Sequence, residues 1–260
     1  MPRYKLQLEY LGTKYSGWQI QQNARTVQGE ISAVIRKVTA ESKFELYGSG
    51  RTDHGVHALR QVAHLELKSL LPTDQLRQRL NDALPSDIHV IDVELAHPRF
   101  HARHHAVARS YLYQISRRRT AFGKRLVWWI KDDLDFERMK QAGSLFVGMK
   151  NFESFAANDP EEKSTKVLIE KVQMREAGDL ILIRIEGSHF LWGMVRRMVG
   201  VIAEVGRGKL SVEALAGFFR TRSDDPARLA APPSGLFLER VYYPGDARLH
   251  SLDPVIRILS

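Results

Sequence analysis

The chain has 260 residues and a net charge of +9 at pH 7, and it contains no cysteine. Its length allows one large domain or two domains of ordinary size. The lack of cysteine excludes disulfides and thiol chemistry and is typical of a reducing compartment. The positive charge indicates a polyanionic partner, either nucleic acid or an anionic membrane surface. Because the chain has no signal-peptide core and no apolar run of the roughly 20 residues that span a membrane, we expect a cytoplasmic protein without a membrane partner.

The first part of the chain predicts elements in the order β-α-β-β-α-β. Alternating apolar and polar residues indicate strands at 4–10, 44–47, 62–67 and 88–93. Thr26 caps a helix whose apolar stripe reaches Val38, and Pro72 opens a second helix that Pro85 ends. This order is ferredoxin-like, and it predicts an antiparallel sheet with both helices on one face.

The stretch GSGRTDHGVHA at 48–58 lies between the second and third predicted strands. Its glycines predict a tightly shaped loop. Asp53 can be an ordinary turn residue, since Asp and Gly are common in turns. Arg51 can instead hold the carboxylate charged, and a charged carboxylate in such a loop suits nucleophilic or acid–base work. A metal would find only His54 and His57 there as further ligands, so we expect no metal.

An acid-free segment runs from Leu95 to Lys131. It holds nine basic residues, as many as the net charge of the whole chain: Arg99, Arg103, Arg109, Arg117, Arg118, Arg119, Lys124, Arg125 and Lys131. Because a solvated charged face would mix both signs, we favour a surface that binds phosphate groups. Histidines at 97, 101 and 105 have the spacing of a metal face on a helix, but Pro98 argues against that helix.

The second part predicts another α+β unit. Its strands are expected at 109–115 and 236–243, with a hairpin that joins 166–175 to 180–187. Helices are expected from Asp135 to about Gly148, from Phe190 to Val205, and after a cap at Ser211. Residues 158–164 predict a polar loop.

Arg196 lies on the most apolar of these predicted helices. Val199, Gly200 and Ala203 share its face, and such small residues predict close approach of another element. A buried arginine needs a carboxylate or another acceptor. The alternative is an arginine that extends its head group to water.

The stretch at 48–58 resembles the signature of the TruA family of tRNA pseudouridine synthases. Further matches follow in the family's order: YLGTKYSGWQ at 10–19, FHAR at 100–103, ARSYLY at 108–113, MVRRMVG at 194–200 and GLFL at 235–238. The chain departs from the family at His54, at 192–193 and in the very basic segment 117–129. These departures concern substrate range more than chemistry.

The resemblance implies an α+β fold of two ferredoxin-like (RRM-like) α/β-sandwich halves, 1–104 and 105–260, whose mostly antiparallel sheets join into one central sheet around an active-site cleft. It implies conversion of uridine to pseudouridine in the anticodon stem-loop of tRNA, at tRNA positions 38, 39 and 40. The reaction needs no cofactor and no metal. A homodimer that grips tRNA is implied as well.

The resemblance also implies a catalytic group of Asp53, Tyr111 and Arg196. Asp53 is the expected nucleophile, Arg196 its charge partner, and Tyr111 the ring that stacks on the flipped uracil and later takes a proton. Attack on the base and attack on the sugar both stay open. The expected RNA-binding residues are Arg51, Arg25, Arg103, Arg109, His57 and Arg197.

Two other classes of protein fit part of the pattern. An RNA-binding protein without catalysis fits the charge but leaves the shape of the Asp53 loop unexplained. A phosphate-handling enzyme for small nucleotides would need a Walker-type or dinucleotide glycine fingerprint, and the chain has neither.

Overall fold

A computed structural model describes residues 1–157 and 164–258. Its packing separates two compact units, Met1–Val107 with Phe237–Asp246 and Ala108–Leu236 with Ala247–Ser260. Except for Ser164, the polar loop expected at 158–164 lies outside the described residues. The division into domains 1–104 and 105–260 stays a prediction.

The first unit has the order β-α-β-β-α-β, as predicted. Its elements are β1 (Arg3–Tyr10), α1 (Val27–Thr39), β2 (Glu45–Gly48), β3 (His57–Glu66), α2 (Thr73–Ala83) and β4 (Ile88–Ala96), with a short 3-10 helix at Gly12–Lys14. β1 pairs antiparallel with β3 and β4, and β2 pairs antiparallel with β3. β10 (Leu236–Tyr242) adds a parallel pair with the start of β3, so the sheet is mixed.

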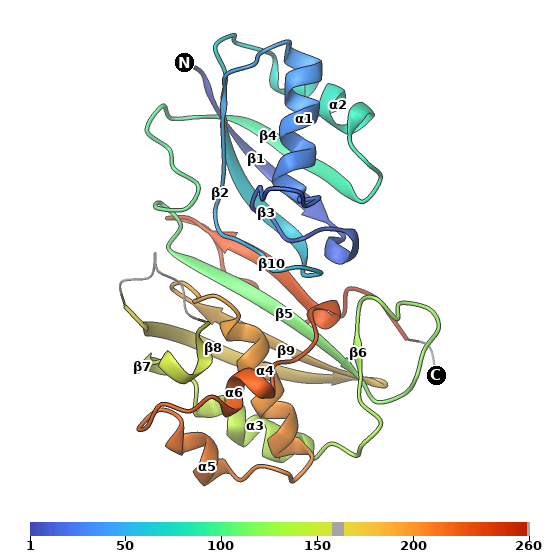
Figure 1. Ribbon diagram of the computed structural model, residues 1–260, viewed down its shortest axis with the longest axis vertical. Helices are drawn as coiled ribbons and strands as arrows, with labels where there is room; N and C mark the ends of the chain where they lie inside the picture. Colours follow the sequence, from blue (N-terminus) through green and yellow to red (C-terminus); the bar gives the residue numbers. More distant parts are fainter. Residues whose placement is uncertain (158–163, 259–260) are drawn as a thin grey trace. The chain divides into compact units, whose positions relative to one another are not determined.

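One face of this sheet forms the core of the first unit. Tyr4, Leu6, Leu8 and Tyr10 alternate along β1 and are all buried. Figure 1 shows α1 and α2 on the same face of the sheet. The predicted cap of α1 is confirmed, because the Thr26 side chain accepts a hydrogen bond from the backbone N–H of Gly29.

β3 is longer than the sequence predicts and begins at His57 instead of Val62. Its first residues pair with partners that are remote in sequence, since His57 lies opposite Phe237 and Ala58 opposite Leu238 and Tyr10. Local alternation does not reveal such partners. As a result, β3 begins directly after the loop that carries Asp53.

The second unit is also α+β. Its strands are β5 (Ala108–Ser116), β6 (Trp128–Trp129), β7 (Gly148–Asn151), β8 (Lys166–Ala177) and β9 (Leu180–Gly187). Its helices are α3 (Phe136–Ser144), α4 (Met194–Gly206), α5 (Val212–Gly217) and α6 (Asp225–Arg228), with short 3-10 helices at Glu153–Phe155 and Pro233–Gly235. β9 pairs antiparallel with β5 and β8, β7 antiparallel with β8, and β6 parallel with β5.

Two predicted helices are shorter than expected. α4 starts at Met194 instead of Phe190, because Gly193 has φ +72° and interrupts the helix there. α3 ends at Ser144, before Gly148, which has φ +103° and begins β7. The hairpin of β8 and β9 is confirmed, with Gly178 at φ +61° in its turn.

β9 is buried along its whole length, which means that both faces of this strand are covered. Arg184 donates from Nη2 to the backbone oxygen of Ser251 over 2.6 Å. The side-chain oxygen of Gln114 on β5 accepts from the backbone N–H of Val255 over 2.7 Å. The segment after β10 therefore packs on this sheet.

Candidate active site

The loop that carries Asp53 joins β2 to β3 and is tied to β3 at its start. The Ser49 N–H donates to the Val62 carbonyl over 2.7 Å, and the Ser49 hydroxyl donates to the side-chain oxygen of Gln61 over 2.7 Å. Gln61 is fully buried and in turn donates to the Gly50 carbonyl over 3.1 Å. The loop is thus held by a buried side chain of the strand that follows it.

A second loop, residues 11–18, packs against the loop that carries Asp53. The Trp18 N–H donates to the Thr52 carbonyl over 3.0 Å, and the Gly55 N–H donates to the Tyr15 carbonyl over 3.3 Å. A Cβ at Gly17, where φ is +88°, would lie 2.4 Å from the Thr52 carbonyl oxygen. Only glycine therefore allows the two loops to approach this closely. The segments 10–19 and 48–58 are therefore joined by backbone hydrogen bonds and close packing.

Tyr10 holds the residue that precedes Asp53. Its hydroxyl lies 2.9 Å from the Thr52 hydroxyl, and both side chains are buried. Burial raises the pKa of Tyr10 to about 12, so the phenol stays protonated at neutral pH. A neutral hydrogen bond thus fixes the backbone directly beside the carboxylate.

The charged groups of the loop differ in exposure. Arg51 and His54 are exposed, and Asp53 is half-buried. His57 is buried, its Nδ1 accepts from the Gly12 N–H over 3.0 Å, and its ring stacks on Phe237 at 4.8 Å. These partners give His57 a structural task, and the RNA contact predicted for it remains a prediction.

Two further predicted RNA-binding residues belong to the first unit. Arg25 is exposed, forms an ion pair with Glu30 over 2.6 Å, and lies over the ring of Tyr15 at 4.8 Å. Arg103 is half-buried and lines a small recess together with Arg51. Both arginines thus belong to the unit that carries Asp53.

Tyr111 and Arg109 lie on β5 in the second unit. Tyr111 is half-buried, and its ring forms a T-shaped pair with the ring of Phe190 at a centroid distance of 5.0 Å. Arg109 donates from Nη1 to the Ser188 carbonyl over 3.0 Å. The strand thus carries both groups beside the segment that leads to α4.

Arg196 on α4 finds its acceptor in the backbone. Its Nε donates to the Ala231 carbonyl over 2.7 Å, and the Ala231 N–H donates back to the Arg196 carbonyl over 2.9 Å. Gly200 permits this contact, since a Cβ there would lie 1.8 Å from the Leu229 carbonyl oxygen. The close approach that the sequence predicted at the small residues is therefore present. Arg197 donates to the Ala156 carbonyl over 2.6 Å.

The structure places the predicted site residues in two groups. Asp53, Arg51, His57, Arg25 and Arg103 belong to the first unit, and Tyr111, Arg109, Arg196 and Arg197 to the second. Tyr10, Thr52 and Gln61, which support the loop, were not predicted from the sequence. No pattern in the sequence singles out Gln61, because Arg60 precedes it and the predicted strand begins only at Val62.

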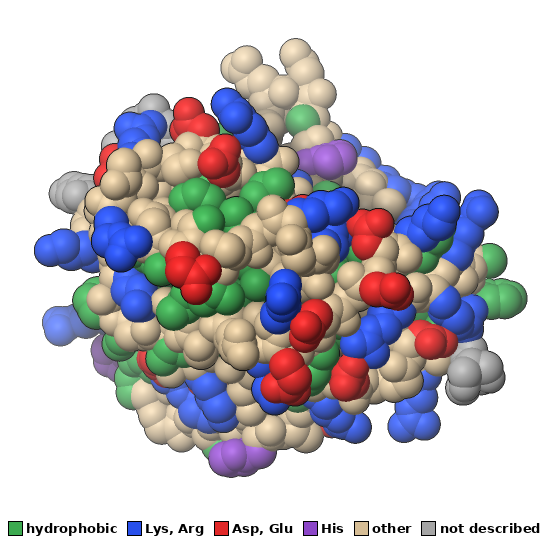
Figure 2. All heavy atoms as spheres, turned by 90° about the horizontal axis from the view of Figure 1, so that it is seen from below, with side chains coloured by type: hydrophobic (Ala, Val, Ile, Leu, Met, Phe, Trp, Pro, Cys, Tyr) green, Lys and Arg blue, Asp and Glu red, His purple; other side chains and the backbone are tan. Residues whose placement is uncertain are grey.

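Two arginines of the acid-free segment pair with acidic residues from another part of the chain. In the acid-free segment, Arg117 forms an ion pair with Glu176, and Arg118 pairs with Asp179 over 2.9 Å. Figure 2 shows a face on which acidic and basic side chains are interspersed, so charge of one sign does not gather there.

Within residues 1–157 and 164–258, no group of three or more His, Asp or Glu side chains is placed to hold a metal ion. In the same residues, no helix is long and apolar enough to cross a membrane.

Comparison with known proteins shows the family. The family model described as tRNA pseudouridine synthase matches residues 8–104 and 142–244. The chain is 39% identical to tRNA pseudouridine synthase A of Rhodopseudomonas palustris over 94% of its own length and all of that protein. It is 37% identical to tRNA pseudouridine synthase A of a Thermoanaerobacter species, over 91% of this chain and 97% of that one. The chain therefore belongs to the family of tRNA pseudouridine synthases and is an isomerase.

A solved structure gives a weaker match. A chain of the archaeal box H/ACA sRNP Nop10–Cbf5 complex is 12% identical, with a TM-score of 0.39 over 89% of this chain and 60% of that chain. A similarity of this size carries no argument about function.

Proposed function

We propose that this chain converts uridine to pseudouridine in the anticodon stem-loop of tRNA, at tRNA positions 38, 39 and 40, with Asp53 as the nucleophile. The observation that carries the proposal is the support of the Asp53 loop on two sides. Buried Gln61 ties it to β3, and Gly17 lets residues 11–18 pack directly on Thr52. Such support holds a reactive side chain on a rigid scaffold.

The reaction is an internal rearrangement of one nucleotide. The bond between C1′ and N1 breaks, the uracil turns, and a bond forms between C1′ and C5. C5 loses a proton and N1 gains one, so the composition is unchanged and no redox partner is required. Asp53 supplies the nucleophile, and its attack on the base and its attack on the sugar both satisfy this balance. The target base must leave its stack, which costs a few kcal/mol.

Two residues of the second unit complete the proposed catalytic group. Arg196 is the proposed charge partner that keeps Asp53 ionised. Tyr111 is the proposed ring against which the flipped uracil stacks, and its hydroxyl takes part in proton transfer as the product forms. The proposal draws on the match of ARSYLY and MVRRMVG to the family's segments.

The proposal assigns RNA contacts to the basic residues around these groups. Arg51 holds a phosphate that flanks the target or fills the space that the flipped base leaves. Arg25, Arg103, Arg109, His57 and Arg197 are the other proposed contacts. We also propose that the protein acts in the cytoplasm as a homodimer, in line with its family and with a chain that has no cysteine.

The test uses Asp53→Asn, which keeps the shape of the side chain and removes the charge. We expect pseudouridine formation on unmodified tRNA to fall at least about a thousandfold, while tRNA affinity changes little. Asp82→Asn is the matched control, because Asp82 is an exposed carboxylate of the same unit and should leave both quantities unchanged. Turnover that survives in Asp53→Asn would refute the role of Asp53 as the nucleophile. Binding without turnover in the parent protein would favour an RNA-binding protein without catalysis.

A further inference from the structure

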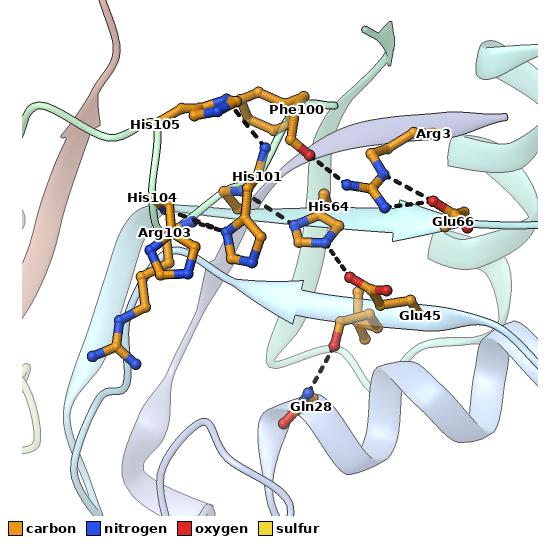
Figure 3. Close-up of polar contacts among 12 residues, drawn as sticks. Arg3, Gln28, Glu45, His64, Glu66, Phe100, His101, Arg103, His104 and His105 are labelled. Atoms are coloured by element: carbon orange, nitrogen blue, oxygen red, sulfur yellow. Dashed lines mark hydrogen bonds and ion pairs between the residues drawn. The ribbon is translucent and has the colours of Figure 1, made fainter. Parts of the chain in front are cut away.

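A buried peptide group follows β4 and is held by two side chains. Ala102 is fully buried, and its N–H donates to Nδ1 of His64 over 3.1 Å. On its other side, the hydroxyl of Tyr243 donates to the Ala102 carbonyl over 2.7 Å. Figure 3 shows the His64 ring directed at this backbone N–H. Both polar groups of Ala102 are therefore satisfied by side chains of other elements.

His64 is itself held in one tautomer. It lies on β3, its side chain is fully buried, and its Nε2 lies 2.6 Å from the carboxylate of Glu45 on β2. Because the Ala102 N–H can only donate, Nδ1 must be unprotonated, and the proton is therefore on Nε2. Burial lowers the pKa of His64, which favours this neutral form. The hydrogen bond from His64 lowers the pKa of Glu45, so the acceptor is ionised.

Other side chains hold the backbone of the residues next to Ala102. Nδ1 of His101 accepts from the backbone N–H of Arg103 over 3.2 Å and from that of His104 over 3.3 Å. Arg3 donates to the Phe100 carbonyl over 2.8 Å on the other side (Figure 3). Side chains thus hold the backbone on either side of Ala102, including the N–H of Arg103.

The side chain of Arg103 reaches the loop of the candidate nucleophile. It lines the same small recess as Tyr47, Gly50 and Arg51. Arginine side chains that line one recess can bind a phosphate from two sides, because each guanidinium presents several N–H donors. Tyr47, 38% accessible, lines the same recess, and its ring stacks on that of His64 at a centroid distance of 5.8 Å.

We propose that His64 is a positioning residue, which holds the Ala102 peptide so that Arg103, together with Arg51, binds the phosphate of a nucleotide flanking the target uridine. The inference rests on the proposed function. It assigns a role in substrate binding to a buried histidine that contacts no substrate. Glu45 orients the ring, Nδ1 of His64 holds the peptide, and Arg103 makes the contact.

The test separates the two nitrogens of His64. His64→Asn places an amide oxygen near the position of Nδ1 and so retains an acceptor for the Ala102 N–H. His64→Gln places its amide near Nε2, which retains the partner of Glu45 and loses that acceptor. We expect His64→Gln to raise the KM for tRNA about five- to fifteenfold, with kcat changed less than twofold. His64→Asn should stay within about twofold of the parent protein.

A double-mutant cycle shows whether His64 acts through Arg103. Arg103→Ala should raise KM about as much as His64→Gln, and the double variant should be no worse than Arg103→Ala alone. Arg79→Ala is the matched control, because Arg79 is an exposed arginine of α2 in the same unit, outside both the recess and the acid-free segment, and should have a small effect. If His64→Gln does not fold, Tyr243→Phe removes the other hydrogen bond to Ala102 and enters the same cycle.

The outcomes distinguish this inference from the proposed function. Equal effects of His64→Asn and His64→Gln, or effects that add fully to that of Arg103→Ala, would overturn the inference. An unchanged KM in Arg103→Ala would overturn it too. A parent protein that makes no pseudouridine in tRNA would instead refute the proposed function. In that case the tRNA dissociation constants of the same variants still test the link between His64 and Arg103.

Discussion

Gly17 is the residue at which the two supporting loops of the candidate site meet. Its φ of +88° and the 2.4 Å approach of the Thr52 carbonyl to a Cβ both require glycine. We therefore expect Gly17→Ala to lower the free energy of unfolding by roughly 2–4 kcal/mol, measured by denaturant titration. Activity should fall as well, because the backbone before Asp53 must shift.

Gly50 provides the control within the same loop. A Cβ at Gly50 meets nothing within 4 Å, and its φ is not positive. Gly50→Ala should therefore change the free energy of unfolding by less than about 0.5 kcal/mol. Equal destabilisation by the two substitutions would mean that close packing on Thr52 is not what requires glycine at position 17.

We expect His101 to make the stability of the first unit depend on pH. Burial and, after it, the charges of His104 and His64 lower the pKa of His101 to about 4, from an ordinary value of 6.5. The unfolded chain therefore takes up this proton more readily than the folded chain does. The stabilising contribution is complete above about pH 6.5 and is lost as the pH falls from 6.5 toward 4.

His101→Asn isolates this effect. The amide oxygen of Asn can still accept from the N–H groups of Arg103 and His104, but it does not titrate. Between pH 6.5 and pH 4, the melting temperature of the parent protein should fall further than that of His101→Asn. Parallel melting curves of the two proteins over this range would show that His101 does not carry the pH dependence.

At the scale of elements, α4 depends on a glycine for its contact with residues 229–231. A Cβ at Gly200 would lie 1.8 Å from the Leu229 carbonyl oxygen. Gly200→Ala should therefore cost more than about 3 kcal/mol of stability. Gly217→Ala in α5, where a Cβ meets nothing within 4 Å, should instead stabilise by about 0.5–1 kcal/mol. Thermal unfolding of both variants tests this, and an unchanged stability of Gly200→Ala would contradict the close approach of α4 to Leu229.

The elements that local patterns encode could be predicted from the sequence. Alternation along β1 and the Thr26 cap of α1 are properties of neighbouring residues, and both are confirmed. The start of β3 at His57 depends on β10, which lies far away in the sequence. β6 has only two residues, too few for any periodicity to show.

At the scale of the whole molecule, the sequence shows the candidate reactive groups but not the contacts that hold them in place. The glycines, Arg51 and the lone carboxylate of Asp53 are visible in one short stretch. Their support by Gly17 and Gln61 depends on three-dimensional contacts between three separate segments. The task of His64 is hidden for the same reason, since its partners Glu45 and Ala102 come from different elements.

The proposed activity is tested most directly by mapping pseudouridine at nucleotide resolution. The parent protein is incubated with unmodified tRNA transcripts, without added cofactor, and each uridine is scored. We predict pseudouridine at positions 38, 39 and 40 in those tRNAs that have uridine there, and none with Asp53→Asn. Pseudouridine confined to other regions of tRNA, or its absence from every transcript, would contradict the account.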